Sequence, residues 1–310
     1  MPPKRKMLRR TFFILCLFIV ISALLPLFIS TEFSYGNVFA AFGLPFDRTK
    51  AHFYRYNKCM HNGVAGLNAS MVWDNLWAIT LECEEASGFN WRLFVPLRNA
   101  DETKYHLLPM AEFACTVLSL GVGHDIKAEQ ILQKLDPRCS FIGVDPTVEG
   151  NRKLYQSIGT FYPYAIGNEN TVVESLVING NDSYYYYSNL TTVEFLQFLQ
   201  TDVKTRVIDQ VFLDAEYAEF RLFEYFLDDR LAHEAKIAIC QINVEVHKPD
   251  VDQMEAFDVF LKKLLLQYHY AVFKVFNVPL AEHIRMVMVN FKDDECAQRY
   301  LSSKNGVFTV

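Results

Sequence analysis

The chain has 310 residues, of which 51% are hydrophobic, and its 30 basic and 36 acidic side chains give a net charge of −6. This composition supplies enough apolar residues for a large core and excludes a strongly basic surface of the kind that binds nucleic acid. The length accommodates one α/β domain of about 200 residues together with further segments.

The N-terminal segment combines a basic cluster with a long uncharged stretch. Five basic residues between Lys4 and Arg10 precede residues 11–30, and the apolar part of that stretch would span about 27 Å as a helix, close to the hydrocarbon thickness of a bilayer. Basic flanks stay cytoplasmic, so we expect residues 1–30 to be a cytoplasmic tail and signal anchor of a single-pass type II protein in the endoplasmic reticulum or Golgi. A signal peptide cleaved near Ala40, which would yield a secreted protein, is the alternative.

Three glycosylation sequons agree with export. Asn68, Asn181 and Asn189 each begin an Asn-x-Ser/Thr triplet without proline, and the last two flank a polar, tyrosine-rich segment. We therefore expect a glycosylated surface on the lumenal side.

The seven cysteines give one predicted disulfide. Cys59 and Cys83 flank a small tryptophan-containing region and are the predicted pair. Cys115 and Cys240 fall in or at predicted core strands and are interpreted as small buried hydrophobes. The partners of Cys139 and Cys296 stay open.

Residues 31–110 show no single long pattern. Residues 31–57 mix Gly, Phe, Pro and Tyr without a period, which is typical of a stem. Strand-like pieces over 76–83 and 91–97 predict a small, partly β region that packs against a main domain over 111–310.

Residues 115–146 organise the main domain as strand, glycine turn, helix and second strand. Gly121 and Gly123 follow the first strand, and Asp145 ends the second, about 24 residues further on. Glycines at such a turn allow close approach of a ligand, and an acid at that distance can bind the hydroxyls of a ribose. The third glycine of the dinucleotide fingerprint is missing, which argues against a pyrophosphate and suits S-adenosylmethionine. Binding of another nucleotide and a tight turn without any ligand remain the alternatives.

Polar residues follow two further predicted strands. A strand over 161–166 precedes Asn168, whose amide could bind an adenine edge or simply form a turn. A strand over 207–213 precedes Asp214 and Glu216. Thr191 with Glu194 predicts a capping box for the helix between these strands.

The C-terminal part contains a strand with an unusual pattern. Over 241–247 polar residues alternate with aliphatic ones, so that Gln241, Asn243, Glu245 and His247 share one face. Four polar residues on one face of a central strand predict a polar network or a site. A helix from Met254 and two antiparallel final strands complete the layout expected of a seven-stranded methyltransferase.

Five motifs together resemble one known family. They stand in the family's order at 118–125, 143–146, 165–169, 212–219 and 240–247. The sequence is similar to FkbM-like methyltransferase domains, in the animal membrane-anchored branch, over about residues 110–300. The resemblance implies a Rossmann-like α/β fold with a seven-stranded mixed sheet, S-adenosylmethionine as cofactor and O-methyltransferase activity.

The resemblance also assigns cofactor contacts. It implies that Gly121 and Gly123 line the methionine end, that Asp145 holds the ribose and that Asn168 lies near the adenine. His124, beside the glycine turn, is a further predicted contact.

The sequence departs from the family pattern at two positions. Ser119 stands where many methyltransferases carry an acid, and Tyr217 replaces a glycine of the fourth-strand motif. A tyrosine there would narrow the pocket or close it.

Transfer of a methyl group to oxygen often uses a general base. His247 is the predicted base, oriented by Glu245 or Asp214, with Glu216 nearby and His124 as second choice. A structural histidine that merely ends the strand is the alternative reading of His247. Asp214, Glu216 and His247 could also gather a divalent cation, although we predict no metal.

The predicted function is an S-adenosylmethionine-dependent O-methyltransferase of the secretory lumen that acts on hydroxyls of glycans or small metabolites, with no nucleic-acid partner. The anchor and the Asp-x-Glu at 214–216 leave a lumenal type II glycosyltransferase as a rival. The departures at Ser119 and Tyr217 leave a non-catalytic binding protein as another.

Overall fold

The structure is a computed structural model that describes residues 48–88, 91–109, 113–178, 185–278 and 282–301. The predicted tail, the signal anchor, most of the predicted stem and the sequon at Asn181 lie outside these residues. No helix in the described ranges is long and apolar enough to span a bilayer. The described elements from residue 52 onward form one compact unit.

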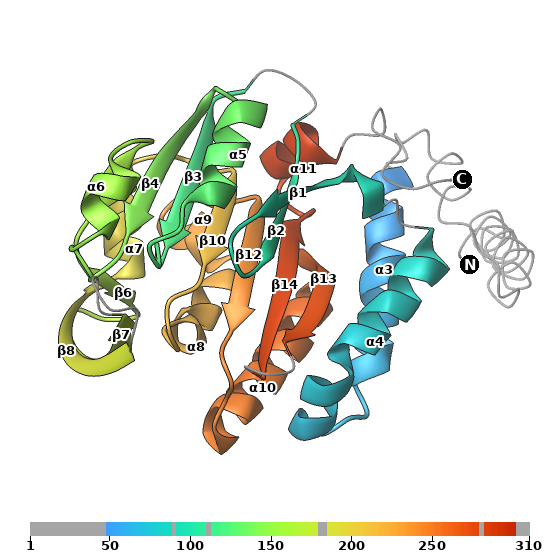
Figure 1. Cartoon of the computed structure of the whole chain (residues 1–310). Helices are drawn as coiled ribbons and strands as arrows, with labels where there is room; N and C mark the ends of the chain where they lie inside the picture. Colours follow the sequence, from blue (N-terminus) through green and yellow to red (C-terminus); the bar gives the residue numbers. More distant parts are fainter. Residues whose placement is uncertain (1–47, 89–90, 110–112, 179–184, 279–281, 302–310) are drawn as a thin grey trace, which may run out of the picture. The chain divides into compact units, whose positions relative to one another are not determined.

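A seven-stranded mixed sheet forms the centre of this unit (Figure 1), in the order β13-β14-β12-β10-β3-β4-β5. Only β14 runs against its neighbours in this sheet. The α/β class, the mixed seven-stranded sheet and the antiparallel final strand are therefore confirmed. In chain order the strands are β3 (Cys115–Leu120), β4 (Cys139–Val144), β5 (Thr160–Tyr162), β10 (Gln210–Leu213), β12 (Gln241–Val246), β13 (Tyr270–Val278) and β14 (His283–Asn290).

Helices cover both faces of the sheet. Successive residues of a strand point to opposite faces, so both faces carry apolar side chains that the helices bury. On β3, Val117 packs into a cluster with α5 and α6, whereas Leu118 packs into the larger cluster with α4, α8 and α10. The helices are α3 (Arg48–Val64), α4 (Ala69–Ser87), α5 (Lys127–Leu135), α6 (Asn151–Tyr155), α7 (Phe195–Phe198), α8 (Glu219–Leu222), α9 (Arg230–Glu234), α10 (Val251–Gln267) and α11 (Asp294–Tyr300), with η1 (Trp91–Leu93), η2 (Leu199–Val203) and η3 (Phe223–Phe226) as shorter turns.

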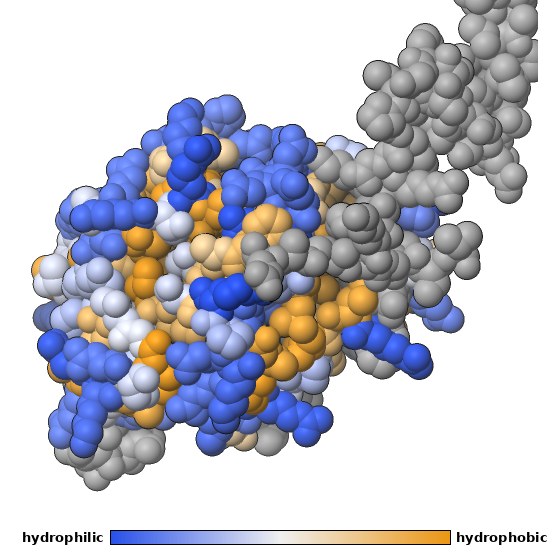
Figure 2. Space-filling view, turned by 90° about the horizontal axis from the view of Figure 1, so that it is seen from above, coloured by the Kyte–Doolittle hydropathy of each residue, from blue (hydrophilic) through white to orange (hydrophobic). Residues whose placement is uncertain are grey.

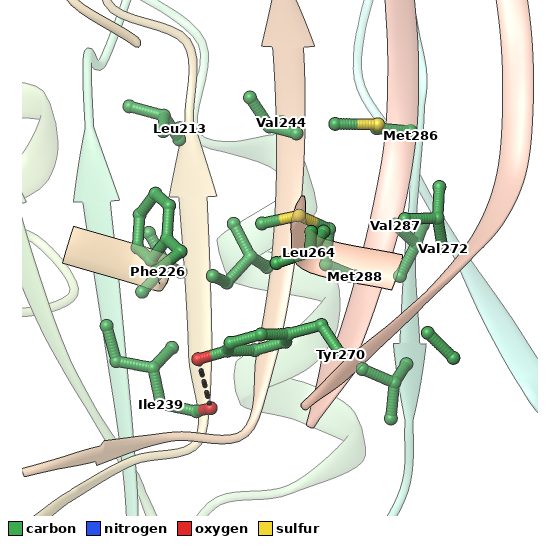
Figure 3. Close-up of a cluster of buried hydrophobic side chains, with 14 of the residues drawn as sticks. Leu213, Phe226, Ile239, Val244, Leu264, Tyr270, Val272, Met286, Val287 and Met288 are labelled. Atoms are coloured by element: carbon green, nitrogen blue, oxygen red, sulfur yellow. Dashed lines mark hydrogen bonds between the residues drawn. The ribbon is translucent and has the colours of Figure 1, made fainter. Parts of the chain in front are cut away.

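The larger cluster fills the space between α10 and the C-terminal strands. Leu264 from α10 lies beside Met288 from β14, and the hydroxyl of Tyr270 donates a hydrogen bond of 3.0 Å to the carbonyl oxygen of Ile239 (Figure 3). Burying an aromatic ring while its hydroxyl keeps a partner avoids the cost of an unpaired polar group. On the face seen from the top of Figure 1, hydrophobic residues show between hydrophilic ones (Figure 2).

Smaller sheets surround the main one. A hairpin of β1 (Phe94–Arg98) and β2 (Thr103–Leu107) lies near β12, and β9 (Val207–Ile208) pairs with β11 (Ala238–Ile239). A three-stranded sheet contains β6 (Ala165–Gly167), β7 (Val172–Ile178) and β8 (Tyr185–Glu194). The predicted strands over 161–166 and 207–213 are thus each divided between two sheets.

Two local predictions are wrong. Residues 76–83 belong to helix α4, whose buried positions Ala69, Val72, Trp73, Leu76, Thr80 and Cys83 recur at helical spacing. The capping box at Thr191 does not form, because Thr191 lies within β8. Glu194 instead caps the short helix α7 with its own side chain, which accepts a hydrogen bond from the backbone N–H of Gln197.

The six described cysteines form three disulfides. Cys59 and Cys83, the predicted pair, are joined. Cys115 and Cys240 are buried in the core, as interpreted, but both are also disulfide-bonded, Cys115 to Cys139 and Cys240 to Cys296. Cys115 and Cys139 stand opposite each other at the first residues of β3 and β4, with Cα atoms 4.2 Å apart. Only the parallel pairing of these strands brings the two side chains together.

Candidate active site at the carboxyl ends of the strands

The turn after β3 requires glycine at its first position. Gly121 has a φ of +89°, and a Cβ atom there would lie 1.7 Å from the carbonyl oxygen of Asp214. Gly123 has a φ of +58° but faces open space. The glycine turn therefore packs directly against the end of β10, and its second glycine leaves room for a ligand.

Asp145, at the end of β4, contacts this turn. Its Oδ2 accepts hydrogen bonds from the backbone N–H groups of Val122 (2.8 Å) and Gly123 (3.3 Å), and its Oδ1 accepts one from Thr147 (2.7 Å). Burial raises the pKa of Asp145, and these backbone hydrogen bonds oppose that rise. A carboxylate has about four acceptor positions, so about one remains for a ligand hydroxyl.

A cavity of about 850 Å³ runs along these strand ends. Its walls include the glycine turn, Asp145, Asp214 and Glu216, and residues of β7 and β8 close another side. The volume falls in the range of pockets that hold small molecules and cofactors. The structure thus brings together the predicted residues Gly121, Gly123, Asp145, Asp214 and Glu216.

Two predicted cofactor contacts lie outside the cavity wall. The ring of His124 is directed to the carbonyl oxygen of Glu149, at 3.1 Å, and is not among the lining residues. Asn168 is exposed, and its carbonyl oxygen accepts a hydrogen bond of 3.3 Å from the hydroxyl of Tyr225. Tyr164, Ala165 and Ile166, just before Asn168, line the cavity instead.

His247 is buried behind the wall and is held by a residue that the sequence analysis missed. Its Nδ1 lies 2.9 Å from Oε1 of Glu219, which also accepts the backbone N–H of His247 at 2.8 Å. The expected orienting partner, Glu245 or Asp214, is therefore corrected to Glu219. The available signal was its place in the 212–219 motif, on the helix that directly follows the strand.

The opposite nitrogen of His247 faces the cavity acids. Nε2 lies 3.3 Å from Oε2 of Glu216 and 3.8 Å from Oδ1 of Asp214. Burial alone would lower the pKa of His247, but Glu219, Asp214 and Glu216 together raise it to about 9. At neutral pH the ring is thus an imidazolium, which has no free nitrogen to accept a proton. This protonation state disfavours His247 as the base.

Asp214, unlike His247, has a pKa that suits a general base. Burial and the charge of Glu245 raise its pKa to about 7, although 37% of its side-chain surface stays exposed in the cavity. A carboxylate with this pKa can both accept and release a proton near neutral pH. Burial likewise raises the pKa of Glu216.

Glu245 is engaged by two basic side chains. His283 Nδ1 lies 2.6 Å from Oε1, and Arg285 forms an ion pair with Oε2. Burial raises the pKa of Glu245, but Arg285 and then His283 lower it overall. The sets Glu245, His247, His283 and Glu102, Asp214, Glu245 each place ligand atoms within 4.8 Å of one another, but a cation would have to compete there with Arg285.

The polar face of β12 explains how β2 reaches the site. The side-chain amides of Gln241 and Asn243 bond the backbone N–H and C=O groups of Leu107 and Tyr105, at 2.7–3.1 Å. These side-chain hydrogen bonds give the backbone of β2 the partners that a paired strand would otherwise provide. The predicted polar network is therefore present, and two of its four residues, Gln241 and Asn243, hold β2 against β12.

Strand β2 contributes Lys104, a site residue that the sequence analysis missed. Lys104 lines the cavity, and its Nζ lies 2.9 Å from Oε1 of Glu102. Burial would lower the pKa of Lys104, but Glu102, Glu129 and Asp214 raise it overall. A single lysine in a short strand carries no sequence signal of this role.

The two departures from the family pattern have different structural settings. Ser119 is fully buried, donates a hydrogen bond of 2.7 Å to Oε1 of Glu129 and receives one of 3.0 Å from the hydroxyl of Tyr155. Tyr217 lines the cavity with its ring 5.2 Å from that of His247. The cavity stays open beside it, so Tyr217 narrows the site without closing it.

A seven-stranded sheet in this order, with a glycine turn and an acid at the ends of neighbouring strands, defines a Rossmann-like methyltransferase fold. The family model of the methyltransferase FkbM domain matches residues 60–300. The chain therefore belongs to the FkbM methyltransferase domain family. The match begins upstream of the quoted motifs and includes the last five residues of α3 and all of α4.

The solved structure of the plantazolicin methyltransferase BpumL in complex with SAH is similar at 10% sequence identity and a TM-score of 0.27, covering 58% of this chain and 77% of that one. A score this low supports no argument about the site. Comparison with curated proteins returns no match.

Proposed function

We propose that this protein is an S-adenosylmethionine-dependent O-methyltransferase of the secretory lumen, acting on hydroxyls of glycans or small metabolites. The proposal depends on one observation: Asp145 and the glycine turn share a cavity with Asp214 and Glu216. Membership of the FkbM family supports methyl transfer.

The residues present fit the cofactor. Gly123 is open to the cavity, Asp145 keeps an acceptor position for a ribose hydroxyl, and the volume is sufficient for an adenosine with a methionine chain. When bound, S-adenosylmethionine supplies an electrophilic methyl group. The glycine turn and Asp145 would hold the nucleoside part, and Tyr164 and Ile166 would border the base.

Asp214 is the proposed general base. Its carboxylate would accept the proton that the acceptor hydroxyl loses when its oxygen bonds the methyl group and S-adenosylhomocysteine leaves, and its pKa of about 7 would allow it to release that proton to water. The imidazolium of His247 keeps Glu216 and Asp214 in place at 3.3 and 3.8 Å and offsets their charge. His247 is thus a positioning residue in this proposal.

Two observations support a lumenal location. All six described cysteines are paired, which is typical of proteins that fold in an oxidising compartment. The sequons at Asn68 and Asn189 are exposed. The predicted type II anchor, with secretion after cleavage as the alternative, completes the proposal.

The test uses the full chain produced in a eukaryotic secretory host. Titration with S-adenosylhomocysteine should show binding that weakens about 10–150-fold in Asp145→Ala, the loss expected for a hydrogen bond to a charged group. Asp136→Asn, a buried acid elsewhere that bonds Arg138, should bind normally. Labelled S-adenosylmethionine with a panel of glycans and secreted alcohols then tests transfer, and a shift on endoglycosidase digestion tests glycosylation.

The rivals predict different outcomes. A glycosyltransferase would bind a sugar nucleotide in the presence of manganese and would ignore S-adenosylhomocysteine. A non-catalytic member would bind the nucleoside but give no transfer with any acceptor. Absence of S-adenosylhomocysteine binding would refute the proposed cofactor.

A further inference from the structure

Two consecutive residues after β10 adopt a backbone conformation that L residues avoid. Glu216 has a φ of +44° and Tyr217 a φ of +73°. This left-handed region is uncommon for residues other than glycine and strained for a bulky side chain such as tyrosine. Strain of this kind persists only where the surroundings enforce it, and it concentrates at functional sites.

The surroundings of this turn do enforce it. At its start the backbone N–H of Asp214 donates to the carbonyl oxygen of Leu120 at 2.9 Å, and Gly121 packs against the Asp214 carbonyl. At its end the N–H of Ala218 donates to the carbonyl oxygen of Ala215 at 3.0 Å. The turn therefore has little freedom to relax.

The strained conformation directs two side chains. Glu216 reaches His247 and also lies beside Tyr185 of β8 on the cavity wall. Tyr217 joins the cavity wall, which Tyr185 and Tyr187 also line. Three tyrosines and two acids, Asp214 and Glu216, thus surround the same part of the cavity.

This combination fits one kind of ligand. Aromatic rings offer flat apolar faces against which the C–H face of a saturated ring can pack. Ionised carboxylates are hydrogen-bond acceptors only, so they select groups that donate, such as hydroxyls. A ring with several hydroxyls satisfies both, whereas an open-chain polyol satisfies only the second and loses more conformational freedom when it binds.

We propose that Tyr217 is a specificity-determining residue of the acceptor subsite, where its ring packs against a pyranose that presents a hydroxyl to Asp214. The proposal rests on the proposed function for the identity of the reaction, but the binding it describes does not depend on turnover. The backbone strain at Tyr217 is then the consequence of placing a ring at this point of the wall.

The test measures binding to the full chain saturated with S-adenosylhomocysteine, by ligand-detected NMR. The probes are methyl pyranosides of glucose, galactose, mannose, fucose and xylose, with sorbitol as the open-chain polyol. We expect at least one pyranoside to bind about tenfold more tightly than sorbitol. Tyr217→Gly should remove that preference, and Tyr217→Phe should keep it.

Thermal unfolding separates this role from a structural one. A glycine adopts positive φ without strain, so Tyr217→Gly should keep the wild-type midpoint or raise it by about 2–4 °C. Lys204→Gly, at an exposed residue with a φ of +53° outside the cavity wall, is the matched control and should leave sugar binding unchanged.

Three results would overturn the proposal: no pyranoside bound above sorbitol, an unchanged preference in Tyr217→Gly, or a fall of many degrees in its unfolding midpoint. Pyranoside binding that depends on Tyr217 but occurs without methyl transfer would support this inference and count against the proposed reaction. The two failures are therefore distinguishable.

Discussion

Oε1 of Glu219 accepts hydrogen bonds from both the backbone N–H of His247, at 2.8 Å, and the Nδ1–H of its ring, at 2.9 Å. This one oxygen fixes the end of β12 and the orientation of the imidazole together. Burial lowers the pKa of His247, and the hydrogen bond and charge of Glu219 are the largest of the opposing effects that, together with Asp214 and Glu216, raise it.

Glu219→Gln keeps an acceptor oxygen but removes the charge. We expect the pKa of His247 to fall from about 9 toward its ordinary value near 6.5, as followed by NMR titration of labelled histidines. Because the raised folded-state pKa gives stability that is present below about pH 6.5 and lost as the pH rises through about 9, the variant should also lose this part of the pH dependence of unfolding.

Glu224→Gln is the control for this prediction. Glu224 lies on η3, just after the helix that carries Glu219, and pairs with Arg230 at 2.9 Å. Its removal should leave the His247 titration as in the wild type. An unchanged pKa in Glu219→Gln would show that Asp214 and Glu216 hold the charge on His247 instead.

Asp214→Asn tests the assignment of the base. In the wild type, turnover should rise with pH through about 7, because only the ionised carboxylate accepts a proton. The variant should lose about 10²–10⁴-fold in kcat and show no rise over that range. Rates measured between pH 5.5 and 8.5 at saturating cofactor check both points.

A surface aspartate provides the comparison. Asp74→Asn, at an exposed position of α4, should retain the wild-type rate and profile. If Asp214→Asn keeps most of its activity, proton removal in the transition state does not involve this carboxylate, and positioning alone would account for catalysis.

The sequence predicted the seven-stranded mixed sheet and its antiparallel final strand, because the hydrophobic runs and the short final link constrain them. The same reasoning placed Gly121, Asp145 and Asp214 correctly at adjacent strand ends, since parallel strands bring their carboxyl ends to one edge. It failed where tertiary packing decides: α4 contains strand-like residues over 76–83, but its buried side contacts β13 and α10.

The missed site residues share a physical reason. Lys104 reaches the cavity only because β2 docks on side-chain amides of β12, a contact between segments far apart in the chain. Glu219 stood in a quoted motif, but its bond to His247 depends on the rotation of α8 relative to β12. Neither contact can be predicted from the spacing of residues along the chain.

Asn243→Ala tests the docking of β2. The change leaves the N–H and C=O of Tyr105 without the partners that Asn243 provides, and we expect a loss of about 2–3 kcal/mol in the free energy of unfolding. Urea titration measures this. Asn75→Ala, which removes an exposed hydrogen bond within α4, should cost far less.

A second readout shows whether docking matters to the site. Because β2 carries Lys104 into the cavity, Asn243→Ala should also weaken binding of S-adenosylhomocysteine at temperatures where the variant remains folded. A destabilised variant with normal nucleoside affinity would mean that β2 docking supports the fold alone.

The three disulfides should contribute unequally to stability. Cys59–Cys83 and Cys115–Cys139 each span 24 residues, whereas Cys240–Cys296 spans 56. If the main effect is on the entropy of the unfolded chain, the shorter loops contribute about 3.5 kcal/mol each and the longer one about 4 kcal/mol. Paired Cys→Ser variants, compared by urea unfolding, should therefore rank Cys240→Ser with Cys296→Ser as the least stable.

The disulfides also provide a test of the proposed lumenal location. Cys115 and Cys139 join β3 to β4 at the ends opposite the glycine turn and Asp145, so their removal should lower stability while nucleoside affinity in the folded protein stays normal. A peptide map of the full chain under non-reducing conditions should recover all three pairs. Free thiols at these six positions, or stability that dithiothreitol leaves unchanged, would contradict both the bridges and the argument for a lumenal protein that rests on them.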